Sequence, residues 1–92
     1  MQILKFSASW CNPCKVLTKK LEDLAVEVQN KDFDLDSECF TRYNITSVPT
    51  LVAVDAQGIE VSRFVGFKSV AELKAWINGV VSVVAAQVSV KH

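Results

Sequence analysis

The chain has 92 residues, of which 50% are hydrophobic and 22% are charged. This length predicts a single domain over 1–92, and the apolar fraction excludes a disordered chain. Ten basic and ten acidic side chains cancel, so the basic excess of a nucleic-acid-binding protein is missing. Three cysteines are too few for a secreted disulfide scaffold. We therefore expect a cytoplasmic globular domain that does not bind nucleic acid.

The two ends of the chain lack the patterns of a signal peptide and of a membrane span. The opening residues MQILKFSASW show no basic segment followed by a long apolar stretch. The uncharged segment 75–90 has 16 residues, whereas a membrane-spanning helix needs about 20. We expect no membrane segment. The tail over 79–92 stays open between a helix extension, a strand and a disordered end.

The first half of the chain alternates between strand and helix patterns. Residues 2–7 are mostly apolar, which predicts a buried strand. Apolar side chains at a period of 3.6 predict a helix over 15–25. The alternation of apolar and polar residues predicts a second strand within 26–34. A short helix over 37–43 follows, with Ser37 as its N-cap.

The second half begins where Asn44 suits the left-handed position that ends this short helix. Residues 50–55 and 59–65 read as strands separated by a turn, which predicts an antiparallel hairpin. Ser69 is the expected N-cap of a last helix, whose apolar stripe is Val70, Leu73, Ile77 and Val80. The order β-α-β-α-β-β-α predicts the α/β class. Because helices separate the first three strands, we expect those strands to be parallel.

Two cysteines, Cys11 and Cys14, carry the strongest chemical signal. This C-x-x-C motif follows a predicted strand and begins a predicted helix. Unpaired backbone N–H groups and the helix dipole stabilise a thiolate at such a position. We expect the outer sulfur, on Cys11, to face solvent and attack a disulfide, and Cys14 to be buried and resolve the mixed disulfide. Pro13 presets the helical backbone.

The motif W-C-N-P-C-K, the later S-V-P-T and the V-G-F before the last helix together resemble the thioredoxin family, over about Ile3 to Asn78. The resemblance implies a minimal thioredoxin-like α/β fold without the usual first strand and helix. Its four-stranded mixed sheet, flanked by three helices, should have the order 26–34, 2–7, 50–55 and 59–65, with the last strand antiparallel.

The resemblance also implies a substrate groove beside the cysteines. Val48 and Pro49 should be joined by a cis peptide bond, with the backbone near Val48 binding an extended substrate segment. Gly66 lacks a side chain and so lets another backbone approach. The expected substrate contacts are Trp10, Asn12, Pro13, Val48, Pro49 and Gly66. The plainer alternatives are that Pro49 merely begins a strand and that Trp10 merely packs in the core.

Lys5 departs from the family pattern. It stands six positions before Cys11, where thioredoxins usually carry a buried Asp that helps accept the proton of the inner cysteine. A charged Lys5 cannot accept a proton, but as a cation it would lower the pKa of a nearby thiol. A neutral, desolvated Lys5 could act as a base. Alternatively, its amine snorkels out to solvent.

The predictions for the remaining residues are less specific. Cys39 is expected to pack as a small hydrophobe, with a regulatory thiol as the alternative, and Trp76 is expected to pack beside the stripe. Lys15 and Lys68 either raise the local potential or are simply solvated. A zinc site needs four ligands, and only Cys39 and His92 remain, so we expect no metal.

Taken together, these residues predict a monomeric dithiol–disulfide oxidoreductase that reduces protein disulfides and serves cell redox homeostasis. A thioredoxin-reductase-like donor would supply its electrons, and no cofactor is implied beyond the Cys11–Cys14 pair. A glutathione-linked, glutaredoxin-like enzyme is one alternative, which the Trp of the motif argues against. A thioredoxin-like docking subunit of a larger enzyme is another, because the same groove would serve both.

Overall fold

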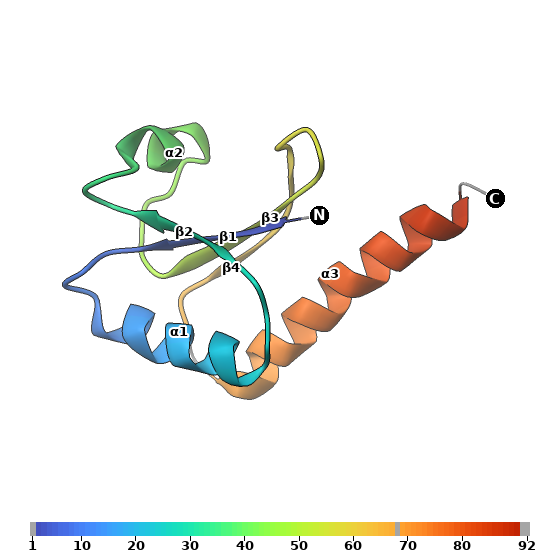
Figure 1. Ribbon diagram of the computed structural model, residues 1–92, viewed down its shortest axis with the longest axis horizontal. Helices are drawn as coiled ribbons and strands as arrows, with labels where there is room; N and C mark the ends of the chain where they lie inside the picture. Colours follow the sequence, from blue (N-terminus) through green and yellow to red (C-terminus); the bar gives the residue numbers. More distant parts are fainter. Residues whose placement is uncertain (1, 68, 91–92) are drawn as a thin grey trace.

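The computed structural model describes residues 2–67 and 69–90 and forms an α/β fold (Figure 1). One four-stranded sheet has the order β2-β1-β3-β4, as expected. Its elements in chain order are β1 (Gln2–Ser7), α1 (Asn12–Asp23), β2 (Gln29–Asp32), α2 (Ser37–Arg42), β3 (Thr50–Val54), β4 (Glu60–Val65) and α3 (Val70–Val90).

The direction of β3 corrects the expectation that the first three strands are parallel. β1 and β2 are parallel, but β3 is antiparallel to β1, with Lys5 opposite Leu51. The reason lies in the connection. The six-residue helix α2 rises only about 9 Å, so it does not carry the chain back along the sheet. β3 therefore starts at the edge where β2 ends, and β4 pairs antiparallel with it as predicted.

The two faces of the sheet bury different clusters. Leu4 and Phe6 point toward α2 and pack with Phe40. The opposite face packs Leu51 against the leucines of α1 and α3, namely Leu17, Leu21 and Leu73. In Figure 1, α1 and α3 lie on one side of the sheet and α2 on the other. Lys5 lies between Leu4 and Phe6 in the sequence. Because side chains alternate along a strand, Lys5 points to the opposite face, which α1 covers.

Both predicted boundaries of the first helix move, and one N-cap is corrected. α1 begins at Asn12 rather than Lys15, because the side chain of Cys11 serves as its N-cap. The helix ends at Asp23 rather than Ala25. Ala25 follows in the left-handed conformation, at φ 56°, and the N–H of Val26 donates back to Leu21 O. The N-cap of α2 is Asp36, not Ser37. The side chain of Asp36 does not bond to the N–H groups of α2. Its Oδ2 instead accepts a hydrogen bond from the N–H of Asp32.

The last helix continues through most of the segment that the sequence left open. Ser69 Oγ accepts from the N–H of Glu72 at 3.2 Å, which confirms the predicted N-cap. Leu73 and Val80 are buried, and Trp76 donates to Ser62 Oγ at 2.8 Å, so the packing prediction for Trp76 is confirmed. The predictions for Lys68 and His92 lie outside the described residues. None of the helices in 2–67 and 69–90 has the length and apolar character of a membrane span.

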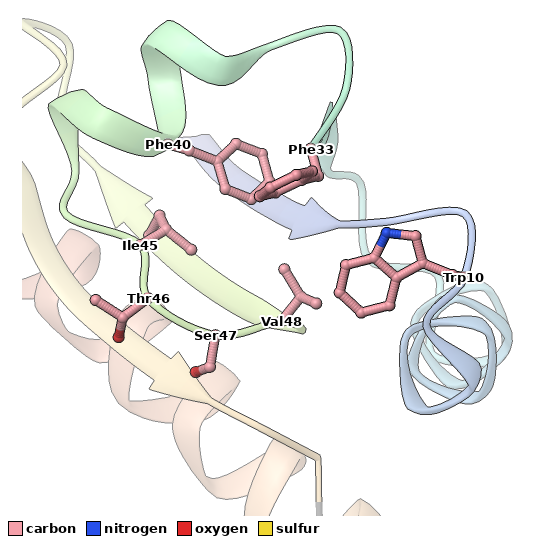
Figure 2. A pocket seen from close by; sticks show the side chains of 7 residues that line it. All are labelled: Trp10, Phe33, Phe40, Ile45, Thr46, Ser47 and Val48. Carbon is pink, nitrogen blue, oxygen red and sulfur yellow. The ribbon is translucent and has the colours of Figure 1, made fainter.

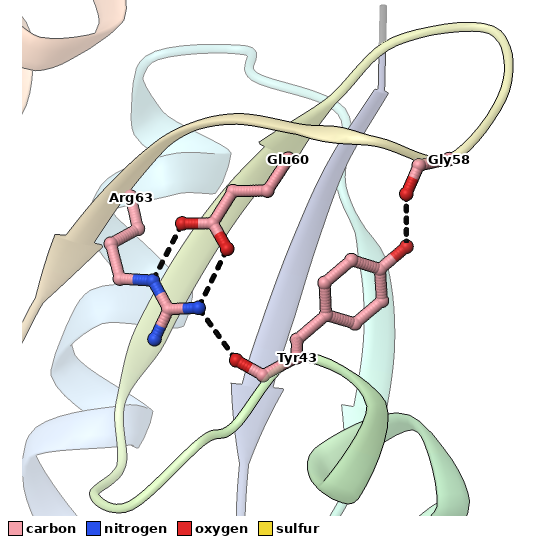
Figure 3. A network of polar contacts seen from close by, with 4 residues as sticks. All are labelled: Tyr43, Gly58, Glu60 and Arg63. Carbon is pink, nitrogen blue, oxygen red and sulfur yellow. Dashed lines mark hydrogen bonds and ion pairs between the residues drawn. The ribbon is translucent and has the colours of Figure 1, made fainter.

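A polar network fixes the segment that follows α2 (Figure 3). Tyr43 Oη donates to Gly58 O at 2.7 Å, in the β3–β4 turn. Arg63 on β4 donates to Tyr43 O at 2.6 Å and pairs with Glu60, both contacts at 2.7 Å. This pairing lowers the pKa of Glu60 below its ordinary value. The network anchors the start of the chain segment that leads to Pro49.

Candidate active site

The N-terminus of α1 holds the cysteine pair. Cys11 and Cys14 form a disulfide with their Cα atoms 5.3 Å apart. The N–H of Cys14 donates to Cys11 Sγ at 3.2 Å, and the N–H of Cys11 donates to Ala8 O at 3.1 Å. The sulfur of Cys11 therefore takes the place that a capping oxygen fills in most helices. A thiolate at this atom would receive the same N–H group and the positive end of the helix dipole.

Burial of the two cysteines differs less than the sequence predicts. Cys11 is 5% exposed and Cys14 is 3% exposed, so the expectation that Cys11 faces solvent is wrong for the oxidised pair. Both pack with Ala8 and with half-buried Val48. The reason is that the loop before β3 covers the disulfide. The edge of this loop therefore forms a rim beside Cys11.

That rim contains the predicted proline. The Val48–Pro49 peptide bond is cis, as expected. Gly66 lies beside it, because its N–H donates to Pro49 O at 2.8 Å. Gly66 has a φ of 77°, and a Cβ added there would meet nothing within 4 Å. The structure thus brings Val48, Pro49 and Gly66 together at the cysteine end of the sheet, with open space above Gly66.

Trp10 lines an apolar hollow on the other side of Val48 (Figure 2). Trp10 is 65% exposed, so it is not a core residue. Its ring meets the edge of Phe33 with centroids 6.2 Å apart. The hollow has a volume of about 100 Å³, and its lining is Trp10, Phe33, Phe40, Ile45, Thr46, Ser47 and Val48. Asn12 and Pro13 are exposed at the start of α1.

Sequence reasoning missed Phe33 and the residues that precede Val48. A signal for Phe33 was present. Parallel strands β1 and β2 end at the same edge of the sheet, and Phe33 directly follows β2. Its N–H donates to Ser7 O at 2.9 Å, so it leaves the sheet beside the loop that leads to Cys11. An exposed aromatic side chain at that point belongs to the same surface as Trp10.

Lys5 is buried directly behind the cysteine helix. It is 5% exposed, so the alternative in which its amine snorkels to solvent is wrong. Its Nζ donates to Thr18 Oγ1, and Thr18 Oγ1 donates to Cys14 O at 3.0 Å. Burial lowers the pKa of Lys5, and the carboxylate of Glu22 partly opposes this shift. Thr18 is a site neighbour that the sequence did not single out.

Two further candidate residues are Cys39 and Lys15. Cys39 is a free, half-buried thiol that packs against the cluster of Leu4 and Phe6, in agreement with its predicted apolar role. Lys15 is exposed on α1. Within the described parts of the chain, no three potential metal ligands come together.

Comparison with known proteins gives one consistent result. Residues 1–79 match the family model described as Thioredoxin. The SPbeta prophage-derived thioredoxin-like protein YosR of Bacillus subtilis (strain 168) is 34% identical over 68 residues, covering 74% of this chain and 85% of that protein. Thioredoxin of Staphylococcus aureus is 35% identical over 74 residues, covering 74% of this chain and 70% of that protein.

A solved structure agrees with these sequence matches. The crystal structure of reduced Schistosoma mansoni thioredoxin pre-protein superposes with a TM-score of 0.72 at 30% identity, over 84% of this chain and 75% of that one. The chain spans about half, 49%, of the mitochondrial relatives that it matches.

Proposed function

Because this chain belongs to the thioredoxin family and is a thiol–disulfide oxidoreductase with a C-x-x-C pair, we propose that Cys11 is its nucleophile and Cys14 its resolving thiol. The observation that carries this assignment is the hydrogen bond from Cys14 N–H to Cys11 Sγ. Only Cys11 occupies the capping position, where the helix terminus stabilises a thiolate.

The exchange takes place in two steps. The Cys11 thiolate attacks one sulfur of a substrate disulfide, which forms a mixed disulfide and releases the other substrate sulfur as a thiolate that takes up a proton. The Cys14 thiolate then attacks Cys11 Sγ, which forms the Cys11–Cys14 disulfide and releases the second substrate thiol. The substrate gains two electrons from the cysteine pair and two protons, one from the Cys14 thiol and one from solvent. A reductase then returns two electrons to the pair.

The substrates we propose are proteins that present a disulfide on an extended segment. The backbone beside Val48 would pair with such a segment as an added strand. Trp10, Asn12, Pro13, Pro49 and Gly66 would line its path, and the open space above Gly66 supports this route. The apolar hollow beside Trp10 would favour a segment with an apolar side chain near its cysteine.

We further propose that residues 1–92 act as a single monomeric domain in the cytoplasm, with a flavin-containing reductase of the thioredoxin-reductase type as the electron donor. Support comes from the composition, which lacks the disulfide density of small secreted domains. Cys39 would remain a reduced thiol in such a compartment. Sedimentation of the reduced protein as a monomer would agree with this assignment, and a stable dimer would contradict it.

Three serine variants test the assignment of the cysteines. The assay follows reduction of a disulfide-bonded protein, with the electron donor in excess. Cys11→Ser should abolish turnover, and Cys14→Ser should accumulate a covalent mixed disulfide. Cys39→Ser is the matched control and should retain turnover. Normal steady-state turnover by Cys14→Ser would contradict the two-cysteine mechanism.

A further inference from the structure

The starting observation is a lysine in the centre of a buried strand. Lys5 pairs with Leu51 on β3 and with Asn30 on β2, and its side chain lies on the face that α1 covers. That face otherwise buries leucines, including Leu17 and Leu51. A charged side chain in such surroundings is costly unless another group compensates it. The contacts of the Lys5 ammonium group therefore decide how its burial is compensated.

Thr18 is the hydrogen-bond partner. Lys5 Nζ donates to Thr18 Oγ1, and the same hydroxyl donates onward to Cys14 O. Thr18 lies one turn after Cys14 on the sheet side of α1, so the hydroxyl can serve both groups. The chain of two hydrogen bonds holds the ammonium against the helix turn that begins with the cysteine pair.

Among the described residues, no carboxylate lies within ion-pairing distance of this ammonium group. The ion pair within the described residues is Arg63–Glu60, and both of its residues belong to β4. Glu22 faces Lys5 from α1 and raises its pKa, but it lies beyond ion-pairing distance. The facing residues on the adjacent strands, Asn30 and Leu51, carry no charge. With the cysteines oxidised, the buried Lys5 therefore has no anionic partner in the part of the chain that the structure describes.

Reduction of the disulfide supplies that anion. The disulfide is neutral, whereas deprotonation of the reduced pair would place a thiolate at the N-cap of α1. We propose that Lys5, positioned by Thr18, stabilises the thiolate form of the reduced Cys11–Cys14 pair and so shifts its equilibrium from disulfide toward dithiol. This inference rests on the proposed function of the two cysteines. Lys5 and Thr18 are positioning residues, since neither touches substrate.

The direction of the effect follows from charge alone. A cation favours the anionic state of a neighbouring thiol and leaves a neutral disulfide unaffected. The reduced form gains, so the potential becomes less negative. Removal of the charge should therefore make the protein a stronger reductant and raise the pH at which its nucleophilic thiol titrates.

The test compares redox equilibria of four proteins in defined glutathione buffers, read by alkylation of free thiols and mass measurement. For Lys5→Met, the constant for reduction of the disulfide should fall about tenfold, which is about 30 mV for a two-electron couple. The thiol titration of the reduced protein should move up by about one pH unit. Thr18→Val keeps the charge but removes its anchor, and should move both readouts in the same direction by a smaller amount.

Lys19→Met is the matched control, because Lys19 is an exposed lysine on the same helix. It should leave both readouts at the wild-type values. Readouts for Lys5→Met and Thr18→Val within about twofold of the wild type would overturn the inference, as would a shift toward a less negative potential. If Lys5→Met fails to fold, Thr18→Val decides the question by the same criteria. A wild-type protein that forms no disulfide would instead overturn the proposed function itself.

Discussion

The backbone N–H of Gly66 donates to the carbonyl oxygen of Pro49 at 2.8 Å. This bond ties the segment after β4 to the loop that covers the disulfide, although the two residues are far apart in sequence. Gly66 adopts a φ of 77°, which side chains disfavour. The two segments together form the rim along which we propose that a substrate approaches Cys11. A substitution at Gly66 should therefore change both the free energy of unfolding and the KM for a protein substrate, and the two effects can be measured separately.

Gly66→Ala should lower the free energy of unfolding by about 1 kcal/mol, because alanine is strained at this φ. It should also raise KM for a protein disulfide, since its methyl group would occupy space otherwise open to the substrate backbone. Urea denaturation and steady-state kinetics measure the two effects. Gly79→Ala, in the exposed part of α3, is the control, where alanine should stabilise the helix by up to about 1 kcal/mol. An unchanged KM for Gly66→Ala would contradict a substrate path over Gly66.

The two tryptophans should respond in opposite ways to truncation. Trp10→Ala should change stability little, because this side chain is mostly exposed, and should raise KM for protein substrates. Trp76→Ala removes packing on Phe64 and the bond to Ser62, and should cost about 3 kcal/mol of unfolding free energy. Thermal or urea unfolding and a kinetic assay on both variants separate the cases. A large stability loss in Trp10→Ala would place Trp10 in the core instead.

The pKa of Lys5 predicts how stability depends on pH. Burial lowers this pKa in the folded state below the ordinary value of 10.5. The unfolded chain therefore binds more protons between these two values, and the stability of the oxidised protein should rise with pH across that window. Lys5→Met should be more stable than the wild type by about 1–3 kcal/mol at neutral pH, because it removes a buried charge without an ion partner.

Urea unfolding of oxidised wild type and Lys5→Met at pH 7 and at pH 10 measures this dependence. The difference between the two proteins should shrink at the higher pH, because the wild type loses the charge that burial penalises. A difference that grows with pH would have the wrong sign. Lys19→Met should follow the wild type at both pH values, since Lys19 is exposed in the folded state.

The electron donor is a separate expectation. Reduced glutathione alone should support slow turnover of a protein disulfide, and a flavin-containing thioredoxin reductase with its nicotinamide donor should support fast turnover. Trp10, which precedes Cys11 in the motif, is the residue that favours this choice over a glutaredoxin-like cycle. Turnover by glutathione at the rate given by the reductase would reverse the choice. The double variant Cys11→Ser/Cys14→Ser should be inactive with either donor.

The sequence predicts the elements of the fold more completely than their directions. Apolar runs, helical periodicity, capping residues and turn residues locate the strands and helices of the described residues, and Asn44 lies at φ 54° as its residue type suggests. The predicted orientation of β3 is wrong, because the direction of this strand depends on the length of α2 and not on any pattern within the strand. The start of α1 was three residues late, because a cysteine that caps a helix through its sulfur is not among the usual capping residues.

The site was predictable where a motif names it and not where packing creates it. Cys11 and Cys14 are found from their C-x-x-C motif, and Pro49 and Gly66 are found from the resemblance to the thioredoxin family. The partnership of Lys5 with Thr18 joins residues 13 positions apart, one on β1 and one on α1. It depends on which face of β1 the helix covers, which no local pattern specifies. The near-equal burial of both cysteines likewise results from the loop at Val48, which packs against them only in the folded chain.

The reduction potential of the wild-type pair in glutathione buffers shows whether Cys11 and Cys14 form a redox-active disulfide whose reduced form Lys5 stabilises. Thioredoxin lies at about −270 mV and protein disulfide isomerase at about −180 mV. We expect a fully reversible Cys11–Cys14 disulfide with a potential between these two values, because Lys5 stabilises the reduced form. A pair that does not exchange with glutathione at all, or a potential below that of thioredoxin, would contradict it.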